Sequence, residues 1–276
     1  MRAALNQAIR ERRIDINVAS LVELPPGRRP KVLVWTPDRS AEWRRAYAAH
    51  VATMERRRQQ LSQREPGNRH GTRINRLDAY IGAPRPSPVM VWTPDQTWTF
   101  LERARRHRLF TLYYLIAFRG LRRGEACGLR RPDLDLDEGT VSVRWQITQL
   151  GGSTDQGRPK SEAGERQVSL DNETVNVLRA HRTKQTHPAY VTEQFELLAM
   201  EAGLPPIRLH DLRHGAATIL LAAGYDMKVV QETLGLSSIT IAADTYTSVL
   251  PDLARRSAED PLCQAQVRQK GMKFPN

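Results

Sequence analysis

The apolar positions along the chain mostly repeat at helical spacing. Residues 109–118 are apolar on nearly every side, which predicts a buried central helix that ends at Gly120. Further helices are expected in an arginine-rich segment near the start and through the second half of the chain. Their predicted ranges are 1–13, 42–64, a stretch after Thr93, 122–129, 172–184, 190–202, 212–223, 227–234 and 239–250.

Two segments follow the pattern of β-strands instead. Residues 140–147 alternate between apolar and polar positions, and a second strand is expected at 166–170 after a glycine-containing break. The pattern therefore predicts an α+β fold that is mainly helical. A small antiparallel β-sheet or hairpin is expected within it, and a basic helical region precedes it.

One short string occurs twice. Residues 32–38 read VLVWTPD and residues 89–95 read VMVWTPD. In each copy a threonine, Thr36 or Thr93, precedes a proline, and this pair is typical of the first residues of a helix. No longer repeat links the copies, so a solenoid is not indicated.

Proline and charge divide the chain into four parts. Residues 1–83 form a basic region, with an extended connection expected at 14–26. Residues 84–88 (PRPSP) have the composition of a stiff linker. Residues 89–250 form the main domain, and the tail 251–276 has weak structural signals.

The charge narrows the set of partners. Forty-two Lys and Arg against thirty Asp and Glu give a net charge of +12, which favours a polyanion such as nucleic acid. A solvated, arginine-rich surface without function is the alternative. No apolar run is long enough to span a membrane, and the charged start is not a signal peptide. Two cysteines, Cys127 and Cys263, exclude a disulfide framework.

Five side chains at the edges of predicted elements have the chemistry of phosphoryl transfer. Arginine holds two phosphate oxygens with its planar fork, which suits Arg122 and Arg213. Tyrosine can attack phosphorus when neighbouring groups lower its pKa, which suits Tyr246. Lysine or histidine can protonate a leaving oxygen, which suits Lys160 and His210. Their spacing alone does not establish that they meet.

Four motifs then appear in a fixed order. They are FRGLRRGEACGL at 118–129, PKS at 159–161, HDLRH at 210–214, and LGLSS at 234–238 followed by DTY at 244–246. Together they resemble the conserved boxes of tyrosine recombinases, the phage integrase family. The similarity covers about residues 89–250 and is greatest to integrases of actinobacterial plasmids and phages.

The resemblance implies a reaction without metal, ATP or any other cofactor. Tyr246 would attack a DNA phosphate, form a 3′-phosphotyrosyl link and release a 5′-hydroxyl. Arg122 and Arg213 would hold the non-bridging oxygens, and Lys160 would be the general acid. His210 would assist proton transfer or bind the phosphate. A second strand's 5′-hydroxyl would then attack the link, so the chain would be an integrase of a mobile element.

The resemblance also implies partners and a location. The partners would be double-stranded DNA at attachment-type sites, further copies of the chain forming a tetramer in synapsis, and an accessory directionality factor. Glu125 would position Arg122. No membrane association is expected, and the protein would act in the bacterial cytoplasm at the nucleoid. His210 and His214 are four residues apart, but no third metal ligand accompanies them, so no metal site is predicted.

Three departures from the family pattern leave alternatives open. Leu236 occupies a position that is usually His or Trp and that donates a hydrogen bond to the phosphate. The segment 182–190 is compressed, and residues 1–83 resemble only part of a core-binding domain. One alternative is therefore a catalytically impaired or inactive DNA-binding relic of an integrase. The others are a type IB topoisomerase-like enzyme and an arginine-rich structural protein.

Overall fold

The computed structural model describes residues 2–22, 32–64, 75–151, 153–159, 164–180 and 186–235. They belong to two compact units, one within residues 1–30 and the other within 31–276. The smaller unit contains α1 (Arg2–Arg10) and the 3-10 helix η1 (Val18–Ser20). The extended connection predicted from residue 14 is therefore wrong at η1, where the Asn17 side chain accepts from the Ala19 N–H and starts a turn.

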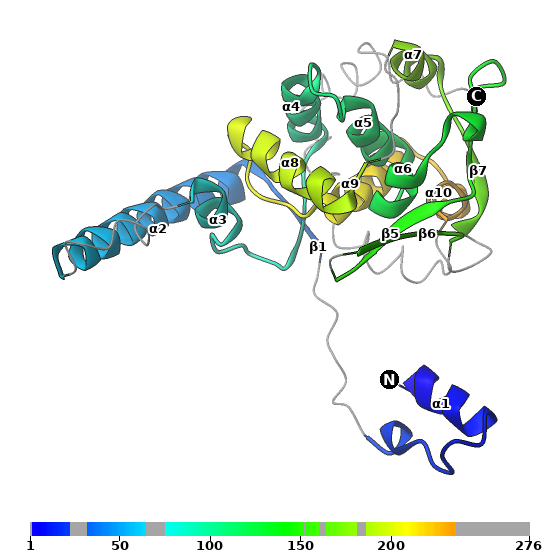
Figure 1. Ribbon diagram of the computed structural model, residues 1–276. Helices are drawn as coiled ribbons and strands as arrows, with labels where there is room; N and C mark the ends of the chain where they lie inside the picture. The colour runs from blue at the N-terminus through cyan, green and yellow to red at the C-terminus, as the bar shows by residue number, and fades with distance from the viewer. Residues whose placement is uncertain are drawn as a thin grey trace. The chain divides into compact units, whose positions relative to one another are not determined.

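The larger unit is mainly helical (Figure 1). Its helices are α2 (Pro37–Arg64), α3 (Arg76–Ile81), α4 (Pro94–Ala104), α5 (Phe110–Arg119), α6 (Arg123–Gly128), η2 (Arg131–Asp133), α7 (Asn172–Ala180), α8 (Pro188–Glu201), α9 (Leu209–Ala222) and α10 (Met227–Leu234). Its strands are β1 (Val32–Val34), β2 (Val89–Val91), β3 (Leu134–Asp135), β4 (Thr140–Val143), β5 (Gln146–Leu150), β6 (Ser153–Gly157) and β7 (Arg166–Ser169).

The strands in the described part of the chain form three small sheets. Strands β1 and β2 are parallel, β3-β4-β7 is antiparallel, and β5-β6 is an antiparallel hairpin. The mainly helical α+β fold with small antiparallel sheets is thus confirmed. Among the described residues, no helix is both long and apolar enough to cross a bilayer.

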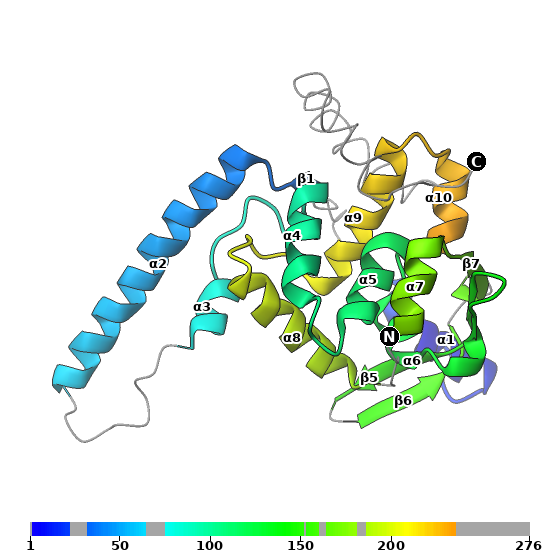
Figure 2. The same cartoon turned by 90° about the horizontal axis from the view of Figure 1, so that it is seen from above.

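Helix α5 is the centre of the core, as predicted. Nearly all of its residues are buried, and it packs on α4, α6, α7 and α9 (Figure 2). It ends at Gly120, whose φ of 61° is left-handed and suits glycine. Aromatic rings continue the core from Tyr113 to Phe100 and Phe195, with centroids 5.3 and 5.9 Å from that of Tyr113. This packing fixes the position of the α5 end, from which the site is built.

The strand predicted over 140–147 is in fact two strands in different sheets. Strand β4 ends at Val143 against Arg166 of β7, and β5 begins at Gln146 and pairs with β6. The Arg130 guanidinium lies 4.4 Å from the centroid of the Trp145 ring at the break. No alternation predicted β6, because its residues are polar and mostly exposed.

The repeated string has a structural role that the sequence did not reveal. The two copies lie side by side, with Val32 opposite Val89 and Val34 opposite Val91. The predicted helix starts are confirmed, since Thr93 forms a capping box with Gln96 at the start of α4. The Gln96 Nε2 also donates to Ser40 Oγ of α2 at 3.2 Å, so the first turns of the two helices are bonded to each other.

Candidate functional site

The first part of the site is the start of α6. Glu125 is fully buried and accepts the Arg122 backbone N–H at 2.8 Å and the Arg122 Nη1 at 2.6 Å. The Arg122 side chain keeps 35% of its surface exposed. The expected pairing of Glu125 with Arg122 is therefore present, and the Arg122 side chain is not fully enclosed.

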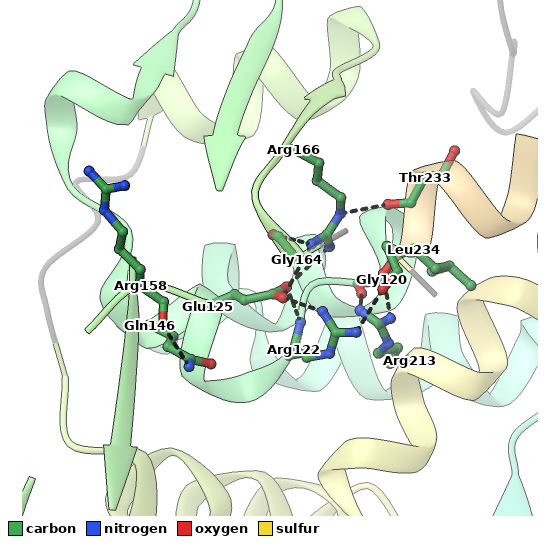
Figure 3. Close-up of polar contacts among 11 residues, drawn as sticks. Gly120, Arg122, Glu125, Gln146, Arg158, Gly164, Arg166, Arg213, Thr233 and Leu234 are labelled. Carbon is green, nitrogen blue, oxygen red and sulfur yellow. Dashed lines mark hydrogen bonds and ion pairs between the residues drawn. The ribbon is translucent and has the colours of Figure 1, made fainter. Parts of the chain in front are cut away.

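Arg213 joins the site from α9. Helix α9 begins at Leu209 rather than at residue 212, because the Asp211 carboxylate accepts from Arg208 at the helix start. The Arg213 side chain is buried and donates to the Gly120 carbonyl at the end of α5 and to the Leu234 carbonyl at the end of α10. Arg122 Nη2 donates to the next carbonyl, that of Gly235, at 2.7 Å. The structure thus brings Arg122 and Arg213 together at the end of α10 (Figure 3).

A third arginine, Arg166, completes this cluster, and the sequence did not reveal it. Its Nη1 and Nη2 donate to the two carboxylate oxygens of Glu125 at 3.2 and 3.1 Å, and its Nε donates to the Thr233 carbonyl at 3.2 Å. A visible signal was an arginine opening a predicted strand close after Lys160. Nothing in that pattern distinguished it from a solvated charge.

The charges of the cluster explain why Glu125 can be buried. Burial alone would raise the pKa of its carboxyl, but hydrogen bonds and charge from Arg166, followed by those from Arg122, outweigh this and lower the pKa. Glu125 is therefore ionised at neutral pH and balances two guanidinium groups. A buried carboxylate with two such partners is held in one position.

His210 lies on α9 one turn from His214, with ring centroids 5.0 Å apart. Part of His210 reaches the surface, yet the surrounding protein, the His214 ring and the Arg213 cation lower its pKa to about 4. The pKa of His214 is lowered too, first by burial. Both rings are therefore neutral at pH 7 and can accept a proton or donate one N–H each.

Two glycines let the helices and strands of the site approach one another closely. A Cβ on Gly120 would lie 1.9 Å from the Leu234 Cδ2, and one on Gly124 would lie 2.7 Å from the Ile147 carbonyl oxygen. Glycine at these positions lets α10 approach α5 and lets α6 lie on β5. The hairpin β5-β6, whose chain continues toward residue 160, is thereby packed on the helix that begins beside Arg122.

A second set of bonds holds the segment that leads into α9. Its consecutive carbonyls accept from buried aromatic side chains. The pairs are Tyr80 Oη to Leu204 at 3.0 Å, Trp92 Nε1 to Pro205 at 2.8 Å and Trp35 Nε1 to Pro206 at 3.2 Å. Both tryptophans belong to the repeated string, which therefore anchors the start of the helix that carries His210 and Arg213.

Three of the predicted site residues cannot be compared with this geometry. Lys160, Leu236 and Tyr246 lie outside the described residues, as does the helix predicted at 239–250. Within the described part of the chain, no group of three or more His, Cys, Asp or Glu could hold a metal ion.

The comparison with known families covers the part of the chain that holds these arginines. The sequence model of the phage integrase family matches residues 93–252, which is more than half of the chain. The chain belongs to the phage integrase family. The matched range contains both arginines, both histidines of α9 and Glu125.

Integrases and recombinases of other organisms are similar to this chain. A tyrosine recombinase XerC-like protein of Caldanaerobacter subterraneus is 27% identical over 208 residues, covering 62% of this chain and 53% of that protein. The ICEBs1 integrase of Bacillus subtilis is 25% identical over 194 residues, covering 61% and 53%. Tyrosine recombinase XerA of Thermococcus kodakarensis is 32% identical over 165 residues, covering 56% and 55%. The chain spans about half the length of these curated relatives.

Solved structures agree on the fold. The Tn1549 transposon integrase in complex with transposon right end DNA aligns with a TM-score of 0.51 at 21% identity, over 60% of this chain and 65% of that one. The same integrase with a circular intermediate DNA gives 0.52 at 19% identity, over 71% and 74%. The likeness supports an integrase-type fold for the larger unit.

Proposed function

We propose that the chain is a site-specific DNA recombinase that cuts and rejoins DNA through a phosphotyrosyl link at Tyr246. The observation that carries the proposal is the meeting of Arg122 and Arg213 at the last turn of α10. The chain continues from that turn toward Tyr246. Two guanidinium groups at one point match the two non-bridging oxygens of a phosphate diester.

In the proposed reaction, the Tyr246 oxygen forms a bond to phosphorus and the bond to the 5′-oxygen breaks. The Tyr246 proton passes to a neighbouring base, and Lys160 gives a proton to the leaving 5′-oxygen. The neutral His210 can donate its N–H to the phosphate. Arg122 and Arg213 exchange their carbonyl partners for phosphate oxygens, which gain charge in the transition state. Attack by another 5′-hydroxyl reverses these steps and joins a new strand.

The proposed partner is duplex DNA at attachment-type sites. A net charge of +12 favours a polyanion, and the Tn1549 integrase was solved with DNA. We further propose that copies of the chain assemble as a tetramer on DNA, with an accessory directionality factor, at the nucleoid. In this proposal residues 89–250 form the catalytic domain, 1–83 a partial core-binding region, 84–88 the linker and 251–276 a tail.

A nicked suicide DNA substrate tests the reaction. The nick lets the strand beyond the cut diffuse away, so a covalent protein–DNA product accumulates and is seen on denaturing gels. We expect an adduct with the natural chain, none with Tyr246→Phe, and an undiminished amount with Tyr190→Phe, which removes a phenol hydroxyl from α8. An adduct that persists in Tyr246→Phe would refute the assigned nucleophile. Absence of any adduct across attachment-type DNAs would refute the reaction.

The second candidate is an impaired or inactive DNA-binding relic, and Leu236 favours it. Leucine cannot donate the hydrogen bond expected there, and loss of one such donor costs about 10²–10³ in rate. A relic would bind DNA in a salt-dependent manner without forming an adduct. If Leu236→His formed an adduct where the natural chain did not, the relic would be the correct description.

A further inference from the structure

The end of α10 is held by three arginines from three elements. Helix ends leave their last carbonyls without partners inside the helix and carry partial negative charge. Here Thr233, Leu234 and Gly235 offer consecutive carbonyls, and each accepts from a different guanidinium. The donors are Arg166 of β7, Arg213 of α9 and Arg122, the residue before α6.

The Arg166 side chain bonds both carboxylate oxygens of Glu125 as well as the end of α10. All three of its side-chain nitrogens are hydrogen-bonded within the protein, to Glu125, Gly164 and Thr233, and only 8% of the side chain is exposed. Its donors are therefore committed to Glu125 and to the end of α10, whereas the Arg122 side chain remains partly exposed. Figure 3 shows Arg166 on the far side of the Glu125 carboxylate from Arg122.

We propose that Arg166 is a positioning residue that holds Arg122, through Glu125, in the orientation that binds phosphate. Each Glu125 oxygen is shared between Arg166 and Arg122, so the carboxylate cannot rotate without breaking bonds to both. Arg166 therefore holds the Glu125 carboxylate in place, and the carboxylate in turn holds the Arg122 guanidinium.

The same side chain joins Glu125 to the helix end that precedes Tyr246. Its bond to Thr233 makes β7, the start of α6 and the end of α10 one connected unit. The orientation of Arg122 and the position of the α10 end are then set together. This inference rests on the proposed function for its effect on cleavage, but its structural part can be measured without cleavage.

The structural part is tested by nitrogen NMR relaxation of the Arg122 side chain, without DNA. In the natural chain we expect a rigid Arg122 Nε–Hε. In Arg166→Met it becomes mobile, whereas Arg166→Lys, which keeps one cation beside Glu125, gives an intermediate result. The matched control is Arg179→Met, which removes an exposed arginine paired with Asp137. An Arg122 signal in folded Arg166→Met as rigid as in the natural chain would overturn the proposal.

The catalytic part is tested by single-turnover cleavage of two substrates. One has the natural phosphate, and the other has a methylphosphonate in which a neutral methyl replaces one charged oxygen. We expect Arg166→Met to slow cleavage of the phosphate about 10²-fold by misplacing Arg122, with unchanged affinity for DNA, and to slow the methylphosphonate far less. Equal losses on both substrates would show a structural role only and overturn the proposal.

The two tests separate this inference from the proposed function. If the natural chain forms no adduct, the proposed reaction fails, yet the relaxation measurement still decides whether Arg166 orders Arg122. If the adduct forms and Arg122 stays rigid without Arg166, only the present inference fails. Arg166→Lys keeps the test open if Arg166→Met does not fold.

Discussion

At two places in the larger unit, three consecutive backbone carbonyls accept hydrogen bonds from three side chains, but the donors differ in chemistry. At the end of α10, three arginines donate to three consecutive carbonyls. At the segment before α9, two tryptophans and a tyrosine do the same. The aromatic donors are neutral and lie in the apolar core, whereas the arginines are charged and Arg122 keeps a third of its side chain exposed.

The difference indicates what each place can do. A neutral donor buried in the core gains nothing from releasing its carbonyl, so the aromatic set is a permanent anchor. A guanidinium can exchange a neutral carbonyl for a negatively charged phosphate oxygen and gain a stronger bond. Helix α9 connects the two places, because it starts at the aromatic anchor and carries Arg213 to the arginine cluster.

Removal of Glu125 should have the largest effect on stability. Glu125→Ala leaves the Arg166 and Arg122 cations without their shared carboxylate, and breaking a buried pair costs about 3–5 kcal/mol of unfolding free energy. Urea denaturation measures this, with Asp137→Ala as the control, since Asp137 pairs with Arg179 at the surface. Equal losses in the two variants would contradict the account.

A substitution in the aromatic anchor should lower the unfolding free energy by a smaller amount. Trp92→Phe removes the donor from the Pro205 carbonyl and leaves a buried acceptor unpaired, which costs about 1–3 kcal/mol. The same substitution at Trp98, which is 39% exposed on α4, should change the unfolding free energy very little. A Trp92→Phe protein as stable as the natural chain would show that the anchor contributes little.

Crowding the contact between α6 and β5 should lower the unfolding free energy by a similar or smaller amount. In Gly124→Ala the new methyl meets the Ile147 carbonyl, and such overpacking costs about 1–3 kcal/mol. Gly215→Ala, inside α9 with open space around it, should instead stabilise by up to about 1 kcal/mol. Thermal unfolding compares the pair, and a neutral Gly124→Ala would mean that β5 can move away from α6.

The pH dependence should be the smallest effect. The folded pKa of His210 lies at about 4, below its ordinary value near 6.5. The neutral ring is therefore favoured in the folded state, and this contribution is complete above pH 6.5 and is lost as the pH falls toward 4. Urea midpoints from pH 7 to 4 should fall less steeply for His210→Gln than for the natural chain. Parallel curves would contradict the shift.

Much of the fold could be predicted from local patterns. The all-apolar stretch of α5 and its glycine stop, and the capping threonine of α4, all carry their signal within a few residues. The meeting of Arg122, Glu125 and Arg213 was also expected, from the resemblance. The assignments of Lys160, Leu236 and Tyr246 and the division at 84–88 stay predictions.

What could not be predicted depends on distant pairing. Strands β1 and β2 have three residues each. They form by pairing with each other although more than fifty residues separate them in the sequence. Strand β6 has no apolar face, and β5 was joined to β4 because alternation continues through Trp145 although the sheet does not. Arg166 was missed because a buried arginine and a solvated one look the same until Glu125 is located.

One pair of variants tests the central claim that the arginine cluster is the phosphate site and the aromatic set is only its anchor. The rate of adduct formation on the suicide substrate and the unfolding free energy are measured for Arg122→Met and Trp92→Phe. We predict that Arg122→Met cleaves about 10²–10³ times more slowly yet remains folded, because Arg166 still pairs with Glu125. Trp92→Phe should lose stability and cleave at the natural rate. Natural-rate cleavage by Arg122→Met would contradict the account.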